Sequence, residues 1–449
     1  MLWNPAAETL SGDDLRALQL GKLQKQLVRV YEASPYIRRR FDEAGVDPHR
    51  FRSLEQLADY PFFDKDLERV SQEESRERHG HPYGLHLACD PRKVIRVSSS
   101  SGTTGKPTYT GYTEADRQVT NEIGARAQWR IGGAPGDVVM HAFVLSMWIA
   151  GSPVLDVLQH AGATTVPIGA MTGAARFAQV AQDVRPVQVN LTPSYARYLF
   201  KKLPEEAGIS AADLGIKRIM VGGEPGAGVP HIREALSAGF GGAKVYDTIG
   251  HTHASFFTSV SCDAHAGMHF LAEDYVHLEV VDPETLRPLP WEDGVTGEIV
   301  VTALEKECAP AIRWREKDIV TIHTRPCECG APGFRFSVGG RADDMLLVRG
   351  VNVFPHAIKD VVQSFAPEVT GEIRVVLDQA PPVAHPPLPV KVELAEHVTG
   401  TAELAARIQA AVHDRLRFTA AIEFAPAGSL TSLGGTLKAR IVEHAYQEA

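Results

Sequence analysis

The middle of the chain alternates strand-like and helix-like segments, and this pattern constrains the fold more than any other feature. Runs rich in β-branched residues occupy 138–143, 164–168, 187–191, 218–223 and 243–250. Helical patterns occupy 154–160 and 174–183. One more helix is expected to begin with Ser194 as its cap, and another lies before residue 243. Strands separated by helices of this length form a parallel sheet with helices on both faces. Ligands bind such sheets at the carboxyl ends of the strands, where Glu224 and residues 246–253 lie.

The segments on either side of this alternation differ from it. The first ninety or so residues are polar and helical, as at 15–31, and residues 262–338 are short β-like runs between Gly, Pro and Asp turns. After Arg341 a small α+β unit is expected, with strands at 345–353, 373–377, 390–394 and 421–424, a proline-rich bend at 381–389, and helices at 355–365 and 402–416. We therefore predict an α/β protein with doubly wound mixed or parallel sheets in a large N-terminal domain (1–342, β-rich at about 260–340) and a small α+β C-terminal lid (343–449).

Composition excludes several classes of protein. The net charge is −9 and the bases form no block, which argues against a nucleic-acid binder. No apolar run approaches the roughly 18 residues of a membrane span, and the N-terminus lacks the pattern of a signal peptide. Five cysteines, an odd number in a long chain, do not suggest a secreted disulfide scaffold. A cytoplasmic location is the expectation.

The strongest local motif is a hydroxyl- and glycine-rich loop that follows a β-rich run at 94–97. It comprises Ser98, Ser99, Ser100, Ser101, Gly102, Thr103, Thr104, Gly105 and Lys106, with Pro107 next. Glycines let the backbone approach an anion closely, while hydroxyls and a lysine donate hydrogen bonds to phosphate oxygens. The alternative is a flexible Ser/Gly linker. After the loop, Thr113 and Asp116 have capping-box spacing and predict a helix that runs to about Arg130.

This loop resembles the phosphate-binding motif of the adenylate-forming superfamily, which includes acyl-CoA synthetases, luciferases and nonribosomal adenylation domains. Four more segments resemble its motifs in the expected order: 222–225 beside the adenine, 246–253 as the aromatic-Gly-x-Thr/Ser-Glu motif, 312–318 with a ribose-binding Asp, and 340–344 as the hinge. Within the superfamily the chain most closely resembles phenylacetate-CoA ligases, on the segments 61–65, 111–113, 192–195 and 349–355.

The resemblance implies an enzyme that uses ATP and Mg²⁺ to convert a small, aromatic carboxylic acid into an acyl-adenylate and passes the acyl group to coenzyme A. It assigns the loop Ser98–Lys106, Glu224, Tyr246, Asp247, Asp318 and Arg349 to the nucleotide, Asp318 through the ribose; Arg341, Thr252, His253 and Lys438 to catalysis; and Asp343 to the hinge. For Asp318 and Arg341 the alternative is a surface ion pair.

The resemblance also places the acyl pocket along residues 141–148. His141, Phe143, Leu145 and Trp148 would form one wall, and Gly222, Gly223, Ile249, Gly250 and His251 would complete the pocket. Aromatic and aliphatic side chains suit an apolar acid. Equally, these residues could be plain core residues of a strand and a helix.

The chain departs from the superfamily pattern at two positions. His253 stands where a metal-binding Glu is expected, and Mg²⁺ prefers oxygen ligands. His251 and His253 could instead contact an anionic group of the substrate, or be structural. In the small domain Thr436 replaces the adenylation lysine, and Lys438, two residues on, shares its face in an extended segment.

These departures leave a second function open. An enzyme that adenylates weakly could transfer an acyl group from a preformed thioester of coenzyme A or of a carrier protein to another acceptor, such as an amine. A carrier protein is therefore a possible partner, and a homodimer is a possible assembly.

Cys262, His269, Cys327 and Cys329 form a candidate metal site in the β-rich region. Three thiolates and one imidazole suit tetrahedral, structural zinc, and relatives of the phenylacetate-CoA ligases carry similar residues. His265 is the alternative to His269, and reduced free cysteines are the alternative to a metal site. Cys89 and Cys308 have no evident partners and are expected to be ordinary residues.

Overall fold

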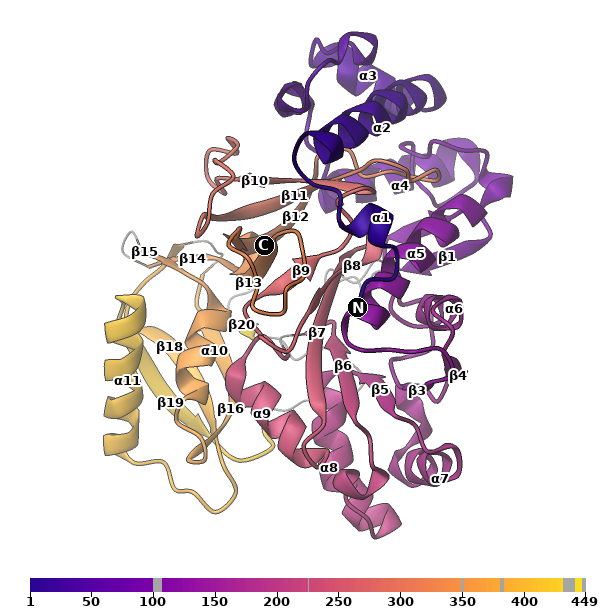
Figure 1. The fold of residues 1–449 in the computed structure, drawn as a ribbon. Coiled ribbons are helices and arrows are strands. Elements are labelled where there is room, and N and C mark those ends of the chain that lie inside the picture. Colours follow the sequence, from indigo (N-terminus) through magenta and orange to yellow (C-terminus); the bar gives the residue numbers. More distant parts are fainter. Residues whose placement is uncertain (100–106, 225, 349–350, 380–382, 431–440, 446–449) are drawn as a thin grey trace. The chain divides into compact units, whose positions relative to one another are not determined.

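The computed structural model describes residues 1–99, 107–224, 226–348, 351–379, 383–430 and 441–445. The chain divides into two compact units (Figure 1). Residues 1–316 and 321–337 form the large unit, and residues 317–320 and 338–449 form the small unit.

Within the described residues the principal sheet has eleven strands in the order β10-β11-β12-β13-β9-β8-β7-β6-β5-β3-β4. They are β3 (Val138–His141), β4 (Thr164–Val166), β5 (Gln188–Leu191), β6 (Arg218–Gly222), β7 (Lys244–His251), β8 (Ser255–Ser261), β9 (Met268–Phe270), β10 (Val276–Val281), β11 (Thr296–Ala303), β12 (Trp314–His323) and β13 (Arg335–Arg341). Strands β3 to β7 are parallel to one another, and β8 runs antiparallel to β7. The predicted α/β fold is therefore confirmed.

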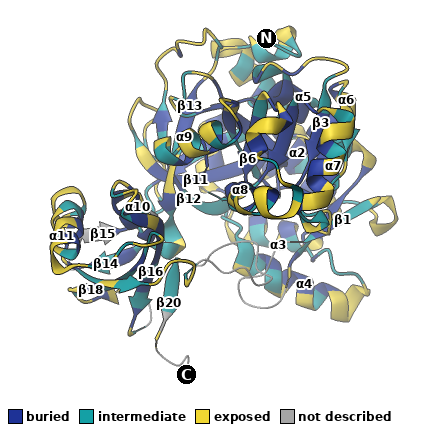
Figure 2. Ribbon diagram, turned by 90° about the horizontal axis from the view of Figure 1, so that it is seen from below, coloured by how far each residue is buried: buried dark blue, intermediate teal, exposed yellow. Residues whose placement is uncertain are grey.

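Helices cover both faces of the parallel part of the sheet. They are α5 (Glu114–Arg130), α6 (Pro153–His160), α7 (Ala174–Val184), α8 (Pro193–Ala207) and α9 (Pro230–Gly239). Side chains of α7, α8 and α9 share one buried apolar core with β3, β5, β6 and β7, whereas α5 packs against α6 and β8. Figure 2 shows buried residues concentrated in strands such as β6 and β11, with exposed residues on the outer sides of α7 and α8.

Two helix caps test the sequence analysis. The capping box of Thr113 and Asp116 is present, and α5 ends at Arg130 as predicted. The prediction that Ser194 caps α8 is wrong: the N-cap is Thr192, whose side chain accepts the backbone N–H of Tyr195. The Thr-Pro pair explains the shift, because proline at the first helical position fixes the start of the helix.

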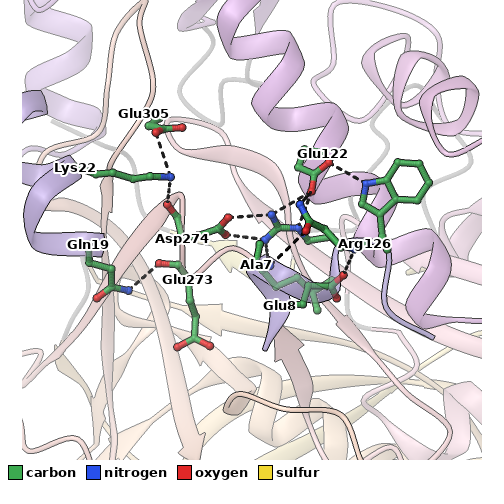
Figure 3. A network of polar contacts seen from close by, with 12 residues as sticks. Ala7, Glu8, Gln19, Lys22, Glu122, Arg126, Glu273, Asp274 and Glu305 are labelled. Atoms are coloured by element: carbon green, nitrogen blue, oxygen red, sulfur yellow. Dashed lines mark hydrogen bonds and ion pairs between the residues drawn. The ribbon is translucent and has the colours of Figure 1, made fainter. Parts of the chain in front are cut away.

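The N-terminal segment forms α1 (Pro5–Glu8), α2 (Gly12–Ala33), α3 (Pro35–Glu43) and α4 (Lys65–His79), followed by a hairpin of β1 (Arg96–Ser99) and β2 (Tyr109–Tyr112). Short 3₁₀ turns lie in this segment at Pro48–Arg50, Leu54–Asp59 and Pro91–Lys93, and later in the chain at Ala170–Thr172, Ala211–Leu214 and Ala342–Asp344. Buried Arg126 of α5 joins this segment to the sheet region (Figure 3). Its guanidinium donates to both carboxylate oxygens of Asp274, at 2.6 and 2.9 Å, and to Glu122, which also accepts the indole N–H of Trp3.

The small unit contains α10 (Pro355–Gln363), α11 (Ala402–Leu416) and two sheets, β15-β14-β17 and β19-β18-β16-β20; the strands are β14 (Leu346–Val348), β15 (Val351–Val353), β16 (Val369–Leu377), β17 (Val383–Ala384), β18 (Leu388–Leu394), β19 (Ala420–Ala425) and β20 (Val442–His444). The single strand predicted at 345–353 is wrong, because β14 and β15 are two antiparallel strands. Across the described parts of both units, none of the helices combines the length and apolar character that a membrane crossing requires.

Candidate active site at the carboxyl edge of the sheet

The described ends of the predicted phosphate loop lie in the β1–β2 hairpin. Ser98 is buried and pairs with Thr110, and Ser99 pairs with Tyr109. The backbone N–H of Ser99 donates to the carbonyl of Met147 at 2.7 Å. The predicted loop residues from Ser100 to Lys106 lie outside the described residues. The hairpin therefore brings the start of the loop against the segment that was predicted to form the acyl pocket.

Three of the predicted pocket residues form an aromatic cluster. Phe143 lies edge-on to both His141 and Trp148, with ring centroids 5.3 Å apart in each pair. Buried His141 donates from Nε2 to the carbonyl of Gly151 at 2.9 Å, and burial lowers its pKa to about 4. Leu145 is 39% exposed, and a Cβ on Gly169 would lie 3.3 Å from its side chain.

Gly223 and Gly222 stand at the end of β6, beside this cluster. A Cβ on Gly223 would lie 3.0 Å from the ring of Trp148, and its φ of 82° falls in the left-handed region. A Cβ on Gly222 would lie 3.1 Å from the carbonyl oxygen of Thr248. Gly223 thus allows the Trp148 ring to lie directly on the backbone of the predicted adenine segment, and Gly222 allows close approach of β7.

The acidic groups predicted to bind the nucleotide hold backbone in place. Glu224 accepts the backbone N–H of Ser194 at 3.2 Å and also its hydroxyl, which ties the end of β6 to the start of α8. Asp247 accepts the N–H of Gly228 at 3.0 Å, and burial raises the pKa of Asp247 to about 7. Tyr246 is buried, and its hydroxyl donates to Asp263 at 2.7 Å.

The end of β7 turns sharply into β8. A Cβ on Gly250, next to Ile249, would lie 1.9 Å from the carbonyl oxygen of Phe256, so only glycine fits. The carbonyl of Thr252 accepts the hydroxyl of Tyr112 at 2.9 Å and the buried ammonium of Lys306 at 3.0 Å. These bonds fix the turn that carries the two histidines.

Both histidines of this turn face a carboxylate. His251 is buried, its Nδ1 lies 3.7 Å from Glu316, and burial lowers its pKa to about 4. His253 donates from Nε2 to Glu68 of α4 at 2.7 Å and stacks on Trp314 with centroids 3.6 Å apart. The sequence analysis missed Glu68, and no local signal marks it, because it lies on a polar helix far away in the chain.

The resemblance implies Mg²⁺ at the position of His253. The side chain at 253 is an imidazole, which Mg²⁺ does not favour, and its Nε2 is engaged by Glu68. His253 therefore does not fit as a magnesium ligand.

In the small unit the predicted ribose and hinge residues lie together. Arg341 donates from Nη1 to Asp318 at 3.0 Å, and from Nε and Nη2 to Asp343 at 2.9 and 3.0 Å. Burial works against the charge of Arg341, but Asp343 and Asp318 outweigh burial and raise its pKa. The predictions for Arg349, Thr436 and Lys438 fall outside the described residues.

The predicted zinc ligands converge within the large unit. One ligand atom from each of Cys262, His269, Cys327 and Cys329 lies within 4.8 Å of all the others. The Sγ atoms of Cys262 and Cys327 are 3.6 Å apart, and Sγ of Cys329 is 3.3 Å from Nε2 of His269. Bonds of about 2.3 Å to sulfur and 2.0–2.1 Å to nitrogen in a tetrahedron require separations of roughly 3.5–3.8 Å. The donor set therefore fits zinc.

Comparisons with known proteins identify the family of the chain. Residues 46–303 match the family model of AMP-binding enzymes, and residues 350–444 match that of the AMP-binding enzyme C-terminal domain. Phenylacetate-coenzyme A ligase of Thermus thermophilus is 36% identical over 382 residues (84% of this chain and 81% of the relative), and that of Escherichia coli is 32% identical over 363 residues (80% and 78%).

Solved structures extend the similarity to nearly the whole chain. A crystal structure of 2-hydroxyisobutyryl-CoA ligase in the postadenylation state, in complex with 2-HIB-AMP, has a TM-score of 0.86 and 29% identity, and the match covers 98% of this chain and 91% of that one. A benzoate CoA ligase from Burkholderia xenovorans, 22% identical with a TM-score of 0.53, shares the fold over 75% of this chain and 65% of that one. This chain belongs to the AMP-binding enzyme family.

Proposed function

We propose that this protein uses ATP to convert a small, apolar or aromatic carboxylic acid into an acyl-adenylate and then transfers the acyl group to coenzyme A. One observation carries the proposal. Ser99 at the start of the phosphate loop bonds to Met147, and the next residue, Trp148, lies against Gly223 of the adenine segment. These contacts support phosphate, adenine and acid subsites at one edge of the sheet, which the joining of an acid to a nucleotide requires.

The chemistry follows from the weakness of a carboxylate as an acyl donor, since its leaving group would be oxide. Attack of the carboxylate on the α-phosphate releases pyrophosphate and makes AMP the leaving group, which a thiol can displace. Both steps need reactants held in line and charge on phosphoryl oxygens stabilised by fixed donors. In this proposal the loop at Ser98–Lys106 supplies those donors, and Arg341 and Asp318 bind the nucleotide sugar region.

An apolar acid suits the wall formed by Phe143 and Trp148. Phe143 is 3% exposed and its ring stands at 86° to that of Trp148, so the two present fixed aromatic surfaces. The phenylacetate-CoA ligases among the relatives support an aryl acid as substrate. Asp343 is proposed as the hinge and Lys438 as the adenylation lysine.

His253 favours a second candidate, an acyl transferase that uses a preformed thioester. Pyrophosphate release with a panel of aryl and alkyl acids, with and without coenzyme A, separates the two. Release that depends on the acid supports the ligase. No release with ATP, together with turnover of an aroyl-CoA, would replace it with the transferase.

We also propose that Cys262, His269, Cys327 and Cys329 hold a structural zinc ion. Four protein ligands close the coordination shell and leave no position for substrate. When bound, the ion would cross-link the segment from β8 to β9 with the loop between β12 and β13, and it would take no part in acyl activation.

A further inference from the structure

Glu68 brings a buried carboxylate to the end of β7 from α4, a helix of which the family motifs include only the first residue, Lys65. Glu68 is 1% exposed, and His253 is 7% exposed. Burial alone would raise the pKa of Glu68, but the charge of His253 and its hydrogen bond outweigh burial and leave the pKa below its ordinary value. The carboxylate is thus ionised and can only accept, so Nε2 of His253 carries the proton of the 2.7 Å bond.

The same face of α4 also holds the phosphate-loop hairpin. Gln72, one turn after Glu68, donates to the carbonyl of Tyr109 at 2.6 Å and accepts the N–H of Tyr109 at 2.9 Å. The hydroxyl of Thr108, beside Tyr109, bonds to Glu68. One helix face therefore connects the strand that leaves the loop with the turn that follows β7.

One ring nitrogen of His253, Nδ1, is not used by the contact with Glu68. Among the described residues Nδ1 has no hydrogen-bond partner, although it is fully buried. The ring cannot turn to satisfy it, because Nε2 is held by Glu68 and one face lies on Trp314 at 3.6 Å. A buried polar atom without a partner is costly unless a ligand meets it.

We propose that Glu68 is a positioning residue for adenylation, which holds His253 so that Nδ1 meets the polyphosphate end of ATP. The inference rests on the proposed function, because that function brings the polyphosphate to the loop and to the end of β7. It also accounts for the misfit of His253 with Mg²⁺: the carboxylate missing at position 253 is present nearby, and it acts on the histidine.

The test compares two nucleotides that differ in the polyphosphate. Binding of α,β-methylene-ATP and of AMP is measured calorimetrically, with Mg²⁺ present, for the wild type, Glu68→Ala, His253→Ala and the double variant. We expect each single variant to bind the ATP analogue about tenfold more weakly and AMP within about twofold of wild type. The double variant is expected to be no weaker than either single one, because the two residues act as a unit.

Two further variants serve as controls, one on the surface of α4 and one that changes Glu68 conservatively. Glu74→Ala removes a surface ion pair with Arg78 on the same helix and should bind both nucleotides normally. Glu68→Gln keeps an acceptor for Nε2 in a side chain of equal size, and should fall between wild type and Glu68→Ala.

Three outcomes would overturn the proposal: normal binding of the analogue by Glu68→Ala and Glu68→Gln, equal loss for the analogue and AMP, or multiplying losses in the double variant. A wild-type protein that binds neither nucleotide would instead overturn the proposed function itself.

Discussion

Two clusters of polar side chains in the large unit contain histidine, and they differ in the groups that their ring nitrogens face. In the cysteine-rich cluster the ligand atoms face one another within 4.8 Å. At the end of β7 each histidine faces a carboxylate instead, Glu316 for His251 and Glu68 for His253.

The two clusters therefore differ in the kind of ligand that each would bind. Three cysteines and a histidine that converge in this way suit a metal cation, and we expect the first cluster to be stabilised by one. In the second cluster carboxylates of the chain itself, Glu68 and Glu316, face the histidines, and Nδ1 of His253 is left for a ligand. The first cluster is therefore expected to be structural and the second is available for function.

The largest expected effect is loss of the metal. Cys327→Ser should reduce zinc from about one ion per chain to near zero, and should cost several kcal/mol of folding free energy, up to the ~10 kcal/mol of structural zinc sites. Metal content by plasma mass spectrometry and thermal unfolding measure the two effects. Cys89→Ser, half-buried outside the cluster, is the control and should keep its zinc. If the wild-type protein contains no metal, the cysteine-rich cluster is not a structural metal site, and the proposed difference between the two clusters is wrong.

The next effect concerns the turn that carries the second cluster. Gly250→Ala places a Cβ 1.9 Å from a backbone oxygen, and the β7–β8 corner cannot yield as a side chain would. We expect a loss of about 4 kcal/mol or more, at the exceptional end for single substitutions. Gly21→Ala in α2, where a Cβ meets no atom within 4 Å, should instead stabilise by about 0.5–1 kcal/mol. The free energies of unfolding of both variants, measured in urea, test whether the turn between β7 and β8 is rigid; a small loss for Gly250→Ala would contradict this.

The sequence predicts the two clusters unequally, for physical reasons. The convergence of Cys262, His269, Cys327 and Cys329 could be predicted because metal chemistry restricts residue types strongly; that they bind zinc stays a prediction. Glu68 could not be found, since an acid on a polar helix has many possible roles and its partner lies 185 positions away. The alternation of strands and helices predicts the sheet, because burial repeats with the period of each element. The cap at Thr192 and the break between β14 and β15 depend on single residues, which periodicity does not resolve.

The third effect is acid sensitivity caused by two buried histidines, His141 and His251. Burial lowers the pKa of His141 and His251 to about 4, below the roughly 6.5 of an unfolded chain. Their stabilising contribution is complete above pH 6.5 and is lost as the pH falls toward 4, about 3 kcal/mol per histidine by pH 4. Unfolding of the zinc-loaded protein between pH 7 and 4.5 should show this loss, and His141→Asn and His251→Asn should each flatten the slope. The exposed His413→Asn on α11 should leave it unchanged, and a slope unaffected by either buried substitution would contradict the assignment.

The smallest expected effect lies at the pocket wall, where Phe143 and Trp148 pack together. Trp148→Ala removes a ring that packs on Phe143 at 5.3 Å and covers Gly223. Loss of one aromatic contact in an apolar pocket lowers kcat/KM for an aryl acid by about 10–100-fold. The corresponding value for acetate, which reaches no aromatic wall, should change by less than about threefold, because the adenylation machinery is intact. Steady-state kinetics with phenylacetate, benzoate and acetate test this difference. Equal losses for all three acids would mean that Trp148 supports the backbone at Ser99 and Gly223 rather than the acid, and the wall would then belong with the parts of the site that the fold completes before substrate arrives.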